Sequence, residues 1–274
     1  MSTLREVQLC GLEILKDVVE VCEKHKITYW LSYGTLLGAV RHQGFIPWDN
    51  DIDIEMPVED YKQFLKIAPV ELPKDLFLQT YFSDPGYNEM WAKVRRKGTT
   101  SLPVAWKNYH INLGIGIDIF PVVGLYKNGH MRRLQNKLLR INRALLSKEF
   151  AYATQQENWK QNWKDEFMYS IPMKIRHFIC KLNEIIIFKK FKNSEKVSTV
   201  ELGFTSNLDI QAYEERTTLL FEDKEFYVPN QFDYILTEIY GDYMTPPPVE
   251  ERNGHEGSLG KIIYDCERDY SYYQ

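Results

Sequence analysis

Long apolar segments are absent from this 274-residue sequence. A membrane-spanning helix needs roughly 20 consecutive apolar residues, and the longest obvious run, at residues 185–188, is far shorter. The first residues also lack the basic segment followed by an apolar segment that marks a secretory signal. We therefore expect a cytoplasmic protein without a membrane-spanning helix.

Cysteine is scarce, and the few cysteines do not form a metal-binding pattern. None belongs to a C-x-x-C pair, and none has a histidine nearby at zinc-binding spacing. The cysteines are Cys10, Cys22, Cys180 and Cys266. This pattern predicts reduced thiols, as in a cytosolic protein.

Several familiar nucleotide-binding and catalytic motifs are also missing. Gly260-Lys261 has neither the upstream glycine nor the following hydroxyl residue of a P-loop. Ser258 does not lie in a G-x-S-x-G elbow, and no G-x-G-x-x-G follows a predicted strand. The net charge of -4 argues against a dedicated nucleic-acid-binding protein. A nucleotide substrate remains open, because the charge is unevenly distributed along the chain.

The most informative segment that is present alternates acidic and apolar residues at positions 51–56. In a strand, successive side chains point to opposite faces, so Asp51, Asp53 and Glu55 should share one face. Asp49 would join them if the strand began two residues earlier. Two charges about 6 Å apart repel by roughly 3 kcal/mol at an effective dielectric constant of about 20. A bound cation would offset this repulsion.

A second acidic position lies in the alternating segment at residues 115–120, where Asp118 follows Gly116. The isoleucines of this segment should face the core, Asp118 should lie on the opposite face, and Pro121 should end the strand. A neighbouring strand about 4.8 Å away would bring Asp118 close to Asp51 and Asp53. Three clustered carboxylates suit one or two Mg²⁺ ions, and paired ions can clamp a phosphoryl group.

The remaining pattern predicts helices and strands in mixed order. A capping box at Thr3 and Glu6 starts a predicted helix that ends near Lys24. Gly34-Thr35 is predicted to form a turn that gives a phosphate close backbone approach and a hydroxyl. Further helices are predicted over residues 36–40, 57–65 and 231–240, strands over 27–31, 76–82 and 90–96, and a hairpin over 217–228.

Residues 130–148 and 173–192 are predicted to form two basic helices. The polar stretch around Trp159 and Trp163 is predicted to be helical too. The apolar stripe of the second basic helix comprises Phe178, Leu182 and Ile185. Three interpretations of the basic residues stay open: a solvated face, steering of an anionic substrate, or contact with an anionic membrane surface.

The order of a Gly-Thr turn, an Asp-x-Asp strand and a distant aspartate is the signature of the nucleotidyltransferase fold. The run LSYGTLLGAVRHQGFIPWDNDIDIEM at residues 31–56 resembles the defining motif of the LicD family of phosphocholine transferases. Three later segments fit as well: KVRRKGTT at 93–100, GIDIFPVVGL at 116–125 and YGDYMTPPP at 240–248. The resemblance extends from about residue 27 to about residue 248.

The resemblance implies an α+β fold, with a nucleotidyltransferase-like mixed β-sheet core, flanking helices and a helical insertion. Residues 1–125 are expected to form the catalytic core and 126–200 a basic helical region. Residues 201–274 should supply a hairpin, a helix and a loop that complete the site.

The resemblance also implies an activity. Family members transfer phosphocholine from CDP-choline to a sugar hydroxyl of a cell-surface glycan or teichoic-acid precursor, and release CMP. Mg²⁺ would be the cofactor, as one or two ions, with Mn²⁺ as a substitute. The acceptor would be a glycan that can be lipid-linked, handled at the inner face of the cell membrane. Transfer of ribitol phosphate or of a nucleotidyl group stays an alternative, as does an inactive nucleotide-binding scaffold.

The matching positions carry expected roles. Asp51 and Asp53 would bind the metal, and Asp118 would be the third ligand or the base that accepts the proton of the acceptor. Asn50 departs from the aspartate that the family often has, and it should point away from the acidic face. The substrate-binding residues are expected to be Tyr33, Gly34, Thr35, Arg41, Trp48, Lys93 and Arg95. Trp48 and Trp91 could cage a quaternary ammonium, although core packing is favoured for both.

Overall fold

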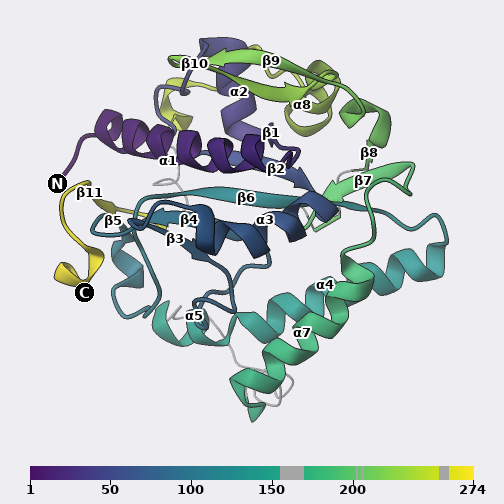
Figure 1. The fold of residues 1–274 in the computed structure, drawn as a ribbon. Helices are drawn as coiled ribbons and strands as arrows, with labels where there is room; N and C mark the ends of the chain where they lie inside the picture. Colours follow the sequence, from purple (N-terminus) through teal and green to yellow (C-terminus); the bar gives the residue numbers. More distant parts are fainter. Residues whose placement is uncertain (155–169, 202, 205–206, 253–258) are drawn as a thin grey trace.

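The computed structural model describes residues 1–154, 170–201, 203–204, 207–252 and 259–274 (Figure 1). The helix predicted around Trp159 and Trp163 lies outside these described residues. The four cysteines are free thiols. Among the described residues, no helix combines the length and apolarity needed to cross a bilayer.

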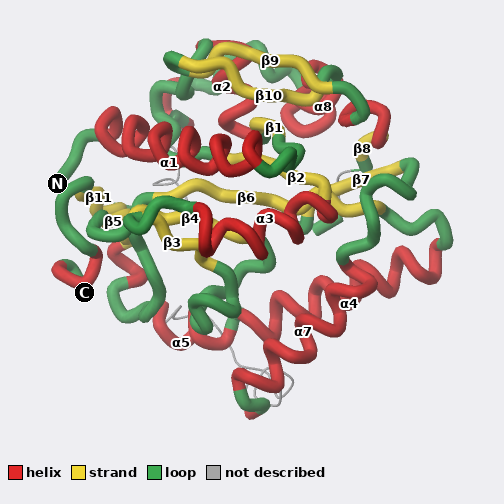
Figure 2. Tube along the Cα trace, viewed as in Figure 1, coloured by secondary structure: helices red, strands yellow, loops and turns green. Residues whose placement is uncertain are grey.

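A mixed β-sheet forms the centre of the molecule, with strand order β1-β2-β6-β4-β3 (Figure 2). β2 and β6 are parallel, and the other pairs in this order are antiparallel. β7 extends the sheet from β6, and β8 pairs with β7. The strands span Trp30–Leu31 (β1), Asp53–Pro57 (β2), Leu76–Gln79 (β3), Ala92–Arg96 (β4), Gly116–Gly124 (β6), Lys196–Thr199 (β7) and Leu208–Asp209 (β8). The predicted α+β class is confirmed.

Smaller sheets and helices surround this centre. Two antiparallel pairs stand apart from it, β5 with β11 and β9 with β10. These strands span Thr100–Pro103 (β5), Ile262–Asp265 (β11), Arg216–Phe221 (β9) and Lys224–Pro229 (β10). The helices are Leu4–Lys24 (α1), Tyr33–His42 (α2), Val58–Glu71 (α3), Gly129–Leu146 (α4), Lys148–Thr154 (α5), Met173–Ile187 (α7) and Phe232–Tyr240 (α8). Short 3-10 helices lie at Val104–Trp106, Ile210–Tyr213, Val249–Glu251 and Tyr270–Tyr272.

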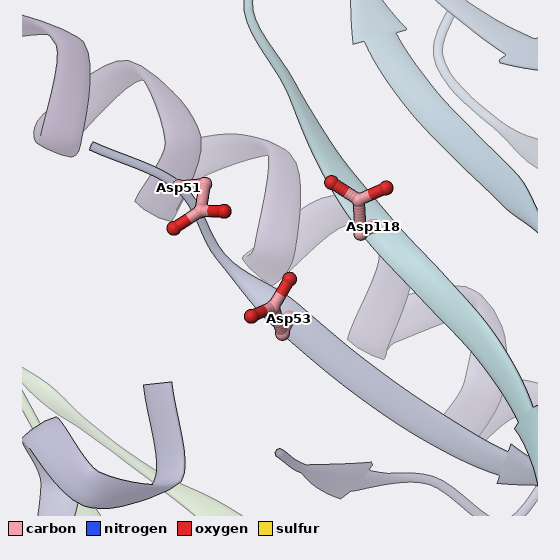
Figure 3. Close-up of side chains that lie close together, drawn as sticks. All are labelled: Asp51, Asp53 and Asp118. Atoms are coloured by element: carbon pink, nitrogen blue, oxygen red, sulfur yellow. The ribbon is translucent and has the colours of Figure 1, made fainter. Parts of the chain in front are cut away.

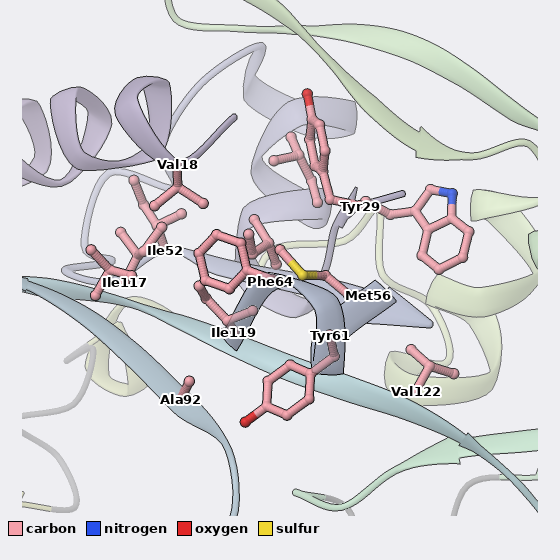
Figure 4. Close-up of a cluster of buried hydrophobic side chains, with 14 of the residues drawn as sticks. Val18, Tyr29, Ile52, Met56, Tyr61, Phe64, Ala92, Ile117, Ile119 and Val122 are labelled. Atoms are coloured by element: carbon pink, nitrogen blue, oxygen red, sulfur yellow. The ribbon is translucent and has the colours of Figure 1, made fainter. Parts of the chain in front are cut away.

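The N-terminal helix starts and ends where the sequence predicts. The hydroxyl of Thr3 accepts from the Glu6 backbone N–H, and the Glu6 carboxylate accepts from the Thr3 N–H at 2.6 Å, which completes the capping box. Val18 of α1 and Phe64 of α3 pack on the isoleucines of β6 (Figure 4). The two helices therefore cover the apolar face of the sheet, and the acidic residues are left on the other face.

Pro121 does not end its strand, contrary to our prediction. β6 continues to Gly124, and Pro121 lies beside Met56 of the parallel strand β2. The Asp118 N–H bonds to Ile52 of the β2 segment, so the position of Pro121 points its missing N–H to the opposite side of β6. On that side, β4 pairs with β6 only as far as Ile119, which lies opposite Ala92. The pairing of β7 with β6 starts at Val122, one residue after Pro121. No ladder hydrogen bond is lost there, and the proline is tolerated.

Two further predictions need correction. Gly34-Thr35 is not a turn, because α2 begins at Tyr33 and contains both residues in its first turn. The strand predicted over residues 27–31 is reduced to Trp30–Leu31. The predicted hairpin and the helix after it are confirmed as β9, β10 and α8.

The two basic helices, α4 and α7, pack side by side below the sheet (Figure 1). The apolar stripe of α7 does not face the core. This helix instead buries Arg176, whose guanidinium donates to the Leu145 carbonyl and pairs with Glu149 of α5. The charged anchor fixes the rotation of α7, and Phe178, Leu182 and Ile185 are turned outward.

Candidate active site

Three aspartates from two strands meet on the face of the sheet opposite α1 and α3. Asp53 of β2 lies directly beside Asp118 of β6 in the parallel register, and Asp51 precedes β2 by two residues. One carboxylate oxygen from each of the three lies within 4.8 Å of the other two. Figure 3 shows the three carboxylates grouped between the strands. The structure thus brings together the three residues that the sequence singled out as metal ligands.

Two neighbours on β4 and in the loop before it hold Asp118. The Lys93 ammonium contacts one carboxylate oxygen at 2.7 Å, and the Trp91 indole N–H donates to the other at 2.6 Å. Lys93 lies beside Asp118 in the antiparallel register, so strand pairing alone creates the ion pair. Trp91 is therefore more than a packing residue, although its sequence position favoured core packing.

The pKa values of Asp53 and Asp49 are raised because both carboxyl groups are buried and lie close to other carboxylates. Burial, followed by the charges of Asp51, Asp118 and Asp49, holds the pKa of Asp53 well above its usual range. Burial and the Asp51 charge raise the pKa of Asp49 to about 8. A divalent cation would remove this repulsion, and carboxylate oxygens are the ligands that Mg²⁺ prefers. The donor set and its spacing fit such an ion.

Glu55 shares the acidic face but lies outside this cluster. Its side chain is buried, and it accepts a hydrogen bond from Tyr213 at 3.1 Å. Burial raises its pKa to about 8. The residue therefore has a partner in the fold, and the metal-ligand set ends at Asp53 on this strand.

A cavity of about 560 Å³ opens over the carboxylates. Its size lies within the range of small-molecule sites. Five of the predicted residues besides Asp51 and Asp53 border it: Tyr33, Gly34, Lys93, Arg95 and Asp118. Tyr240, from the predicted C-terminal segment, borders it too.

Gly34 makes room for the acidic cluster. A Cβ atom at this position would lie 2.6 Å from a carboxylate oxygen of Asp49, closer than such atoms approach. Tyr33 before it has a positive φ of 43° and is held by a hydrogen bond with Thr199 of β7 and an edge contact with Phe120. This strained residue and the glycine set the start of α2 against the acidic segment.

Thr35 and Arg95 have structural partners. The Thr35 hydroxyl accepts from the Asp53 backbone N–H at 2.8 Å, and Thr35 does not border the cavity. Arg95 borders the cavity, but its buried guanidinium donates to Gln79 and to the Gly114 carbonyl at 2.6 Å. These contacts favour positioning of the strands over direct contact with a phosphate.

Arg41 and Trp48 lie away from the cavity. Arg41 donates to the Tyr243 carbonyl at 2.8 Å, and the Trp48 ring carries the Arg252 guanidinium at 4.9 Å from its centroid. Neither residue borders the cavity, so Trp48 and Trp91 do not form a joint cage.

Asn50 borders the cavity, where we expected it to point away from the acidic face. Its amide donates to the Tyr264 hydroxyl of β11, and its N–H donates to Asp49 at 3.0 Å. The residue thus ties the acidic segment to a C-terminal strand.

Glu201 was missed by the sequence analysis. It follows β7 and borders the cavity, and burial raises its pKa. No motif marks this glutamate, because its place depends on β7 joining β6. Only the tertiary structure could identify it.

Comparison with known proteins agrees with this geometry. Residues 26–144 match the family described as LicD/FKTN/FKRP, nucleotidyltransferase domain. The lipopolysaccharide cholinephosphotransferase LicD of Haemophilus influenzae is 28% identical over 279 residues, which cover 92% of this chain and 96% of that protein. Human FKRP, a ribitol 5-phosphate transferase, is 46% identical over 55 residues, 19% of this chain and 11% of FKRP. Human FKTN, a ribitol-5-phosphate transferase, is 34% identical over 56 residues, 20% of this chain and 12% of FKTN.

The matched family domain contains all three clustered aspartates, and the similarity to the bacterial transferase runs through nearly the whole chain. Residues 26–144 of this chain therefore match a LicD-family domain.

Proposed function

We propose that this protein is a metal-dependent transferase that moves phosphocholine from CDP-choline to a sugar hydroxyl of a cell-surface glycan precursor, with release of CMP. The observation that carries the proposal is the cluster of Asp51, Asp53 and Asp118, whose oxygens lie within 4.8 Å of one another at a cavity of about 560 Å³. The similarity to a cholinephosphotransferase over 92% of the chain supports the choline donor.

The three aspartates would hold Mg²⁺, as one or two ions, and Mn²⁺ would substitute. When bound, such ions would neutralise the charge of the pyrophosphate and lower the pKa of the attacking hydroxyl. Asp53 interacts with the charges of both Asp51 and Asp118, and its backbone N–H donates to the Thr35 hydroxyl, which fixes its position. The fold thus fixes the position of this carboxylate before the substrate binds.

Asp118 fits the role of ligand better than that of proton acceptor. Each of its oxygens already accepts one hydrogen bond, from Lys93 and from Trp91. A carboxylate oxygen has two lone-pair directions, so one remains on each for a metal. Lys93 is also the cation nearest the cluster that borders the cavity from β4, and it would bind the donor phosphates.

The similarity to FKRP and FKTN supports a second candidate donor, CDP-ribitol. The shared segments are short, 55 and 56 residues, so they do not distinguish one phospho-alcohol from another. A nucleotidyl transfer on the same core would require a nucleoside triphosphate. A scaffold that only binds nucleotides would keep the fold and lose turnover.

The acceptor and the location are also part of the proposal. A sugar acceptor attached to a lipid would bring the protein to the inner face of the cell membrane. The basic residues of α4 and α7 would contact anionic lipids there, at about 1 kcal/mol per well-placed lysine or arginine.

The test is a screen for CMP release. The protein is incubated with Mg²⁺, a glycan acceptor and, in turn, CDP-choline, CDP-ribitol or a nucleoside triphosphate. Release of CMP from CDP-choline is the expected result, and release from CDP-ribitol alone would establish the second candidate. Asp51→Ala should abolish release, and Glu20→Ala, a change on the exposed face of α1, should not. Turnover retained by Asp51→Ala would overturn the metal assignment.

A further inference from the structure

A second cavity lies beside the site described above. It is a groove of about 1060 Å³ between α3, β3 with the turn after it, and α7. We call it the α3–α7 groove. Its apolar walls come from residues such as Leu65, Leu78, Met90 and Phe188. None of the three clustered aspartates lines this space.

The charged residues that line the α3–α7 groove are mostly basic. Its lining contains one acid, Glu184, and the lysines Lys62, Lys66, Lys74, Lys97 and Lys181. Glu184 accepts a hydrogen bond from Tyr81 at 2.5 Å and pairs with Lys181 at 3.7 Å, so a single carboxylate faces five lysines. Two of the lysines lie against aromatic rings, with Lys62 at 5.5 Å from the Phe188 centroid and Lys181 at 5.2 Å from that of Phe82.

An apolar surface borders the groove. Phe82 and Val70 line it and are 50% and 85% exposed. On α7, Lys181 and Glu184 line the groove, and the next residues along the helix, Leu182 and Ile185, are 49% and 73% exposed. They continue the outward stripe of that helix, which also contains Ile175 and Phe178. An apolar stripe flanked by lysines is the arrangement of helices that lie in the interface of a membrane.

We propose that the α3–α7 groove binds an anionic membrane phospholipid, with the acyl chains between α3 and α7 and the phosphate among the lysines at the rim. Apolar walls with a cationic rim match a ligand that has an apolar chain and an anionic head. The exposed stripe of α7 would rest in the same membrane. This inference does not depend on the transfer reaction.

The groove also reaches the active site through one residue. Trp91 lines both cavities, and its indole N–H donates to Asp118. A lipid chain in the groove would therefore contact the ring that holds a metal-binding carboxylate. This contact gives the binding experiment a local reporter.

The experiment measures binding of short-chain phosphatidic acid, below its micelle concentration, to the full chain by titration calorimetry without donor or metal. Inorganic phosphate and a neutral diacylglycerol of the same chain length are the reference ligands. Lys62→Glu combined with Lys181→Glu reverses the charge at the rim. A control variant, Lys26→Glu combined with Lys107→Glu, makes the same change in net charge at two exposed residues outside the groove.

We expect phosphatidic acid to bind the wild type and the control variant equally, and the rim variant at least about tenfold more weakly. Inorganic phosphate and diacylglycerol should bind more weakly than phosphatidic acid. Equal affinity of all three proteins for phosphatidic acid would overturn the proposal, and so would binding of diacylglycerol as tight as that of phosphatidic acid.

A second measurement keeps the proposal testable if the rim variant does not fold. Phosphatidic acid with brominated chains should quench tryptophan emission in the wild type, and most of this quenching should disappear in Trp91→Phe. Quenching that persists unchanged in Trp91→Phe would show that the chains lie elsewhere and would refute the assignment. Because no turnover is measured, either result leaves the proposed transfer activity unaffected.

Discussion

Replacement of Asp53 by asparagine removes one negative charge from the acidic cluster. It tests how much the repulsion between the carboxylates destabilises the fold, and whether catalysis needs this carboxylate. The side chains have nearly the same shape, so the change removes a charge and leaves the packing intact. The oxygens of Asp53, Asp51 and Asp118 lie within 4.8 Å of one another. At an effective dielectric constant of about 20, one pair at this distance repels by about 3 kcal/mol.

Partial protonation and the Lys93 charge reduce this load, because the pKa of Asp53 is already raised and Lys93 contacts Asp118 at 2.7 Å. In the absence of divalent ions we therefore expect Asp53→Asn to raise the free energy of unfolding by about 1–3 kcal/mol at pH 7.5, well below the sum of two pair repulsions. For a chain of this size, that corresponds to a rise in Tm of about 2–10 °C.

The assay is thermal and urea unfolding with a chelator, and again with Mg²⁺. Mg²⁺ should stabilise the wild type and have little effect on Asp53→Asn, which should also lose CMP release. Asp75→Asn, a change at an exposed residue directly before β3, is the matched control and should leave both properties nearly unchanged. A less stable Asp53→Asn without metal, or one that Mg²⁺ still stabilises and that still turns over, would refute the reasoning.

The remaining predictions concern Gly34, Lys93 and Asp49. Gly34→Ala should reduce kcat for CMP release at least about tenfold. The added Cβ would lie 2.6 Å from a carboxylate oxygen of Asp49 and would displace it. An unchanged kcat would contradict this prediction. Lys93→Met should raise KM for the donor about tenfold and Lys93→Arg should restore part of it, whereas an unaltered KM would remove Lys93 from the donor site. The pKa of Asp49 is raised to about 8, above its unfolded value of about 4, so ionisation destabilises the fold. With a chelator, the free energy of unfolding of the wild type should therefore increase as pH falls from 8.5 to 6.5. The increase should be smaller in Asp49→Asn. A decrease in the wild type over this pH range would contradict the predicted direction.

The sequence predicted those features that depend on neighbouring residues. The capping box set the start of α1, because its two hydrogen bonds join residues three apart. The alternation at residues 51–56 assigned the aspartates to one face and the isoleucines to the other, because the strand period is two. These local rules were sufficient to predict an acidic face on a mixed sheet.

Other features depend on contacts between distant segments. Pro121 was expected to end β6, and it is tolerated because β4 has ended and β7 has not begun beside it. The α7 stripe was assigned as apolar, and its outward direction is set by the buried Arg176 and its partners on α4 and α5. A periodic pattern gives the faces of a helix, but only the packing decides which face is buried.

The same division applies to the site itself. The sequence alone identified Asp51, Asp53 and Asp118 as carboxylates that could bind a metal, because residue type and strand period are local properties. The tertiary structure decided that Asp118 pairs with Asp53, that Lys93 and Trp91 hold it, and that Thr35 and Arg95 serve the fold. It also brought Glu201 to the cavity, since strand register and the pairing of β7 with β6 join residues that no local rule connects.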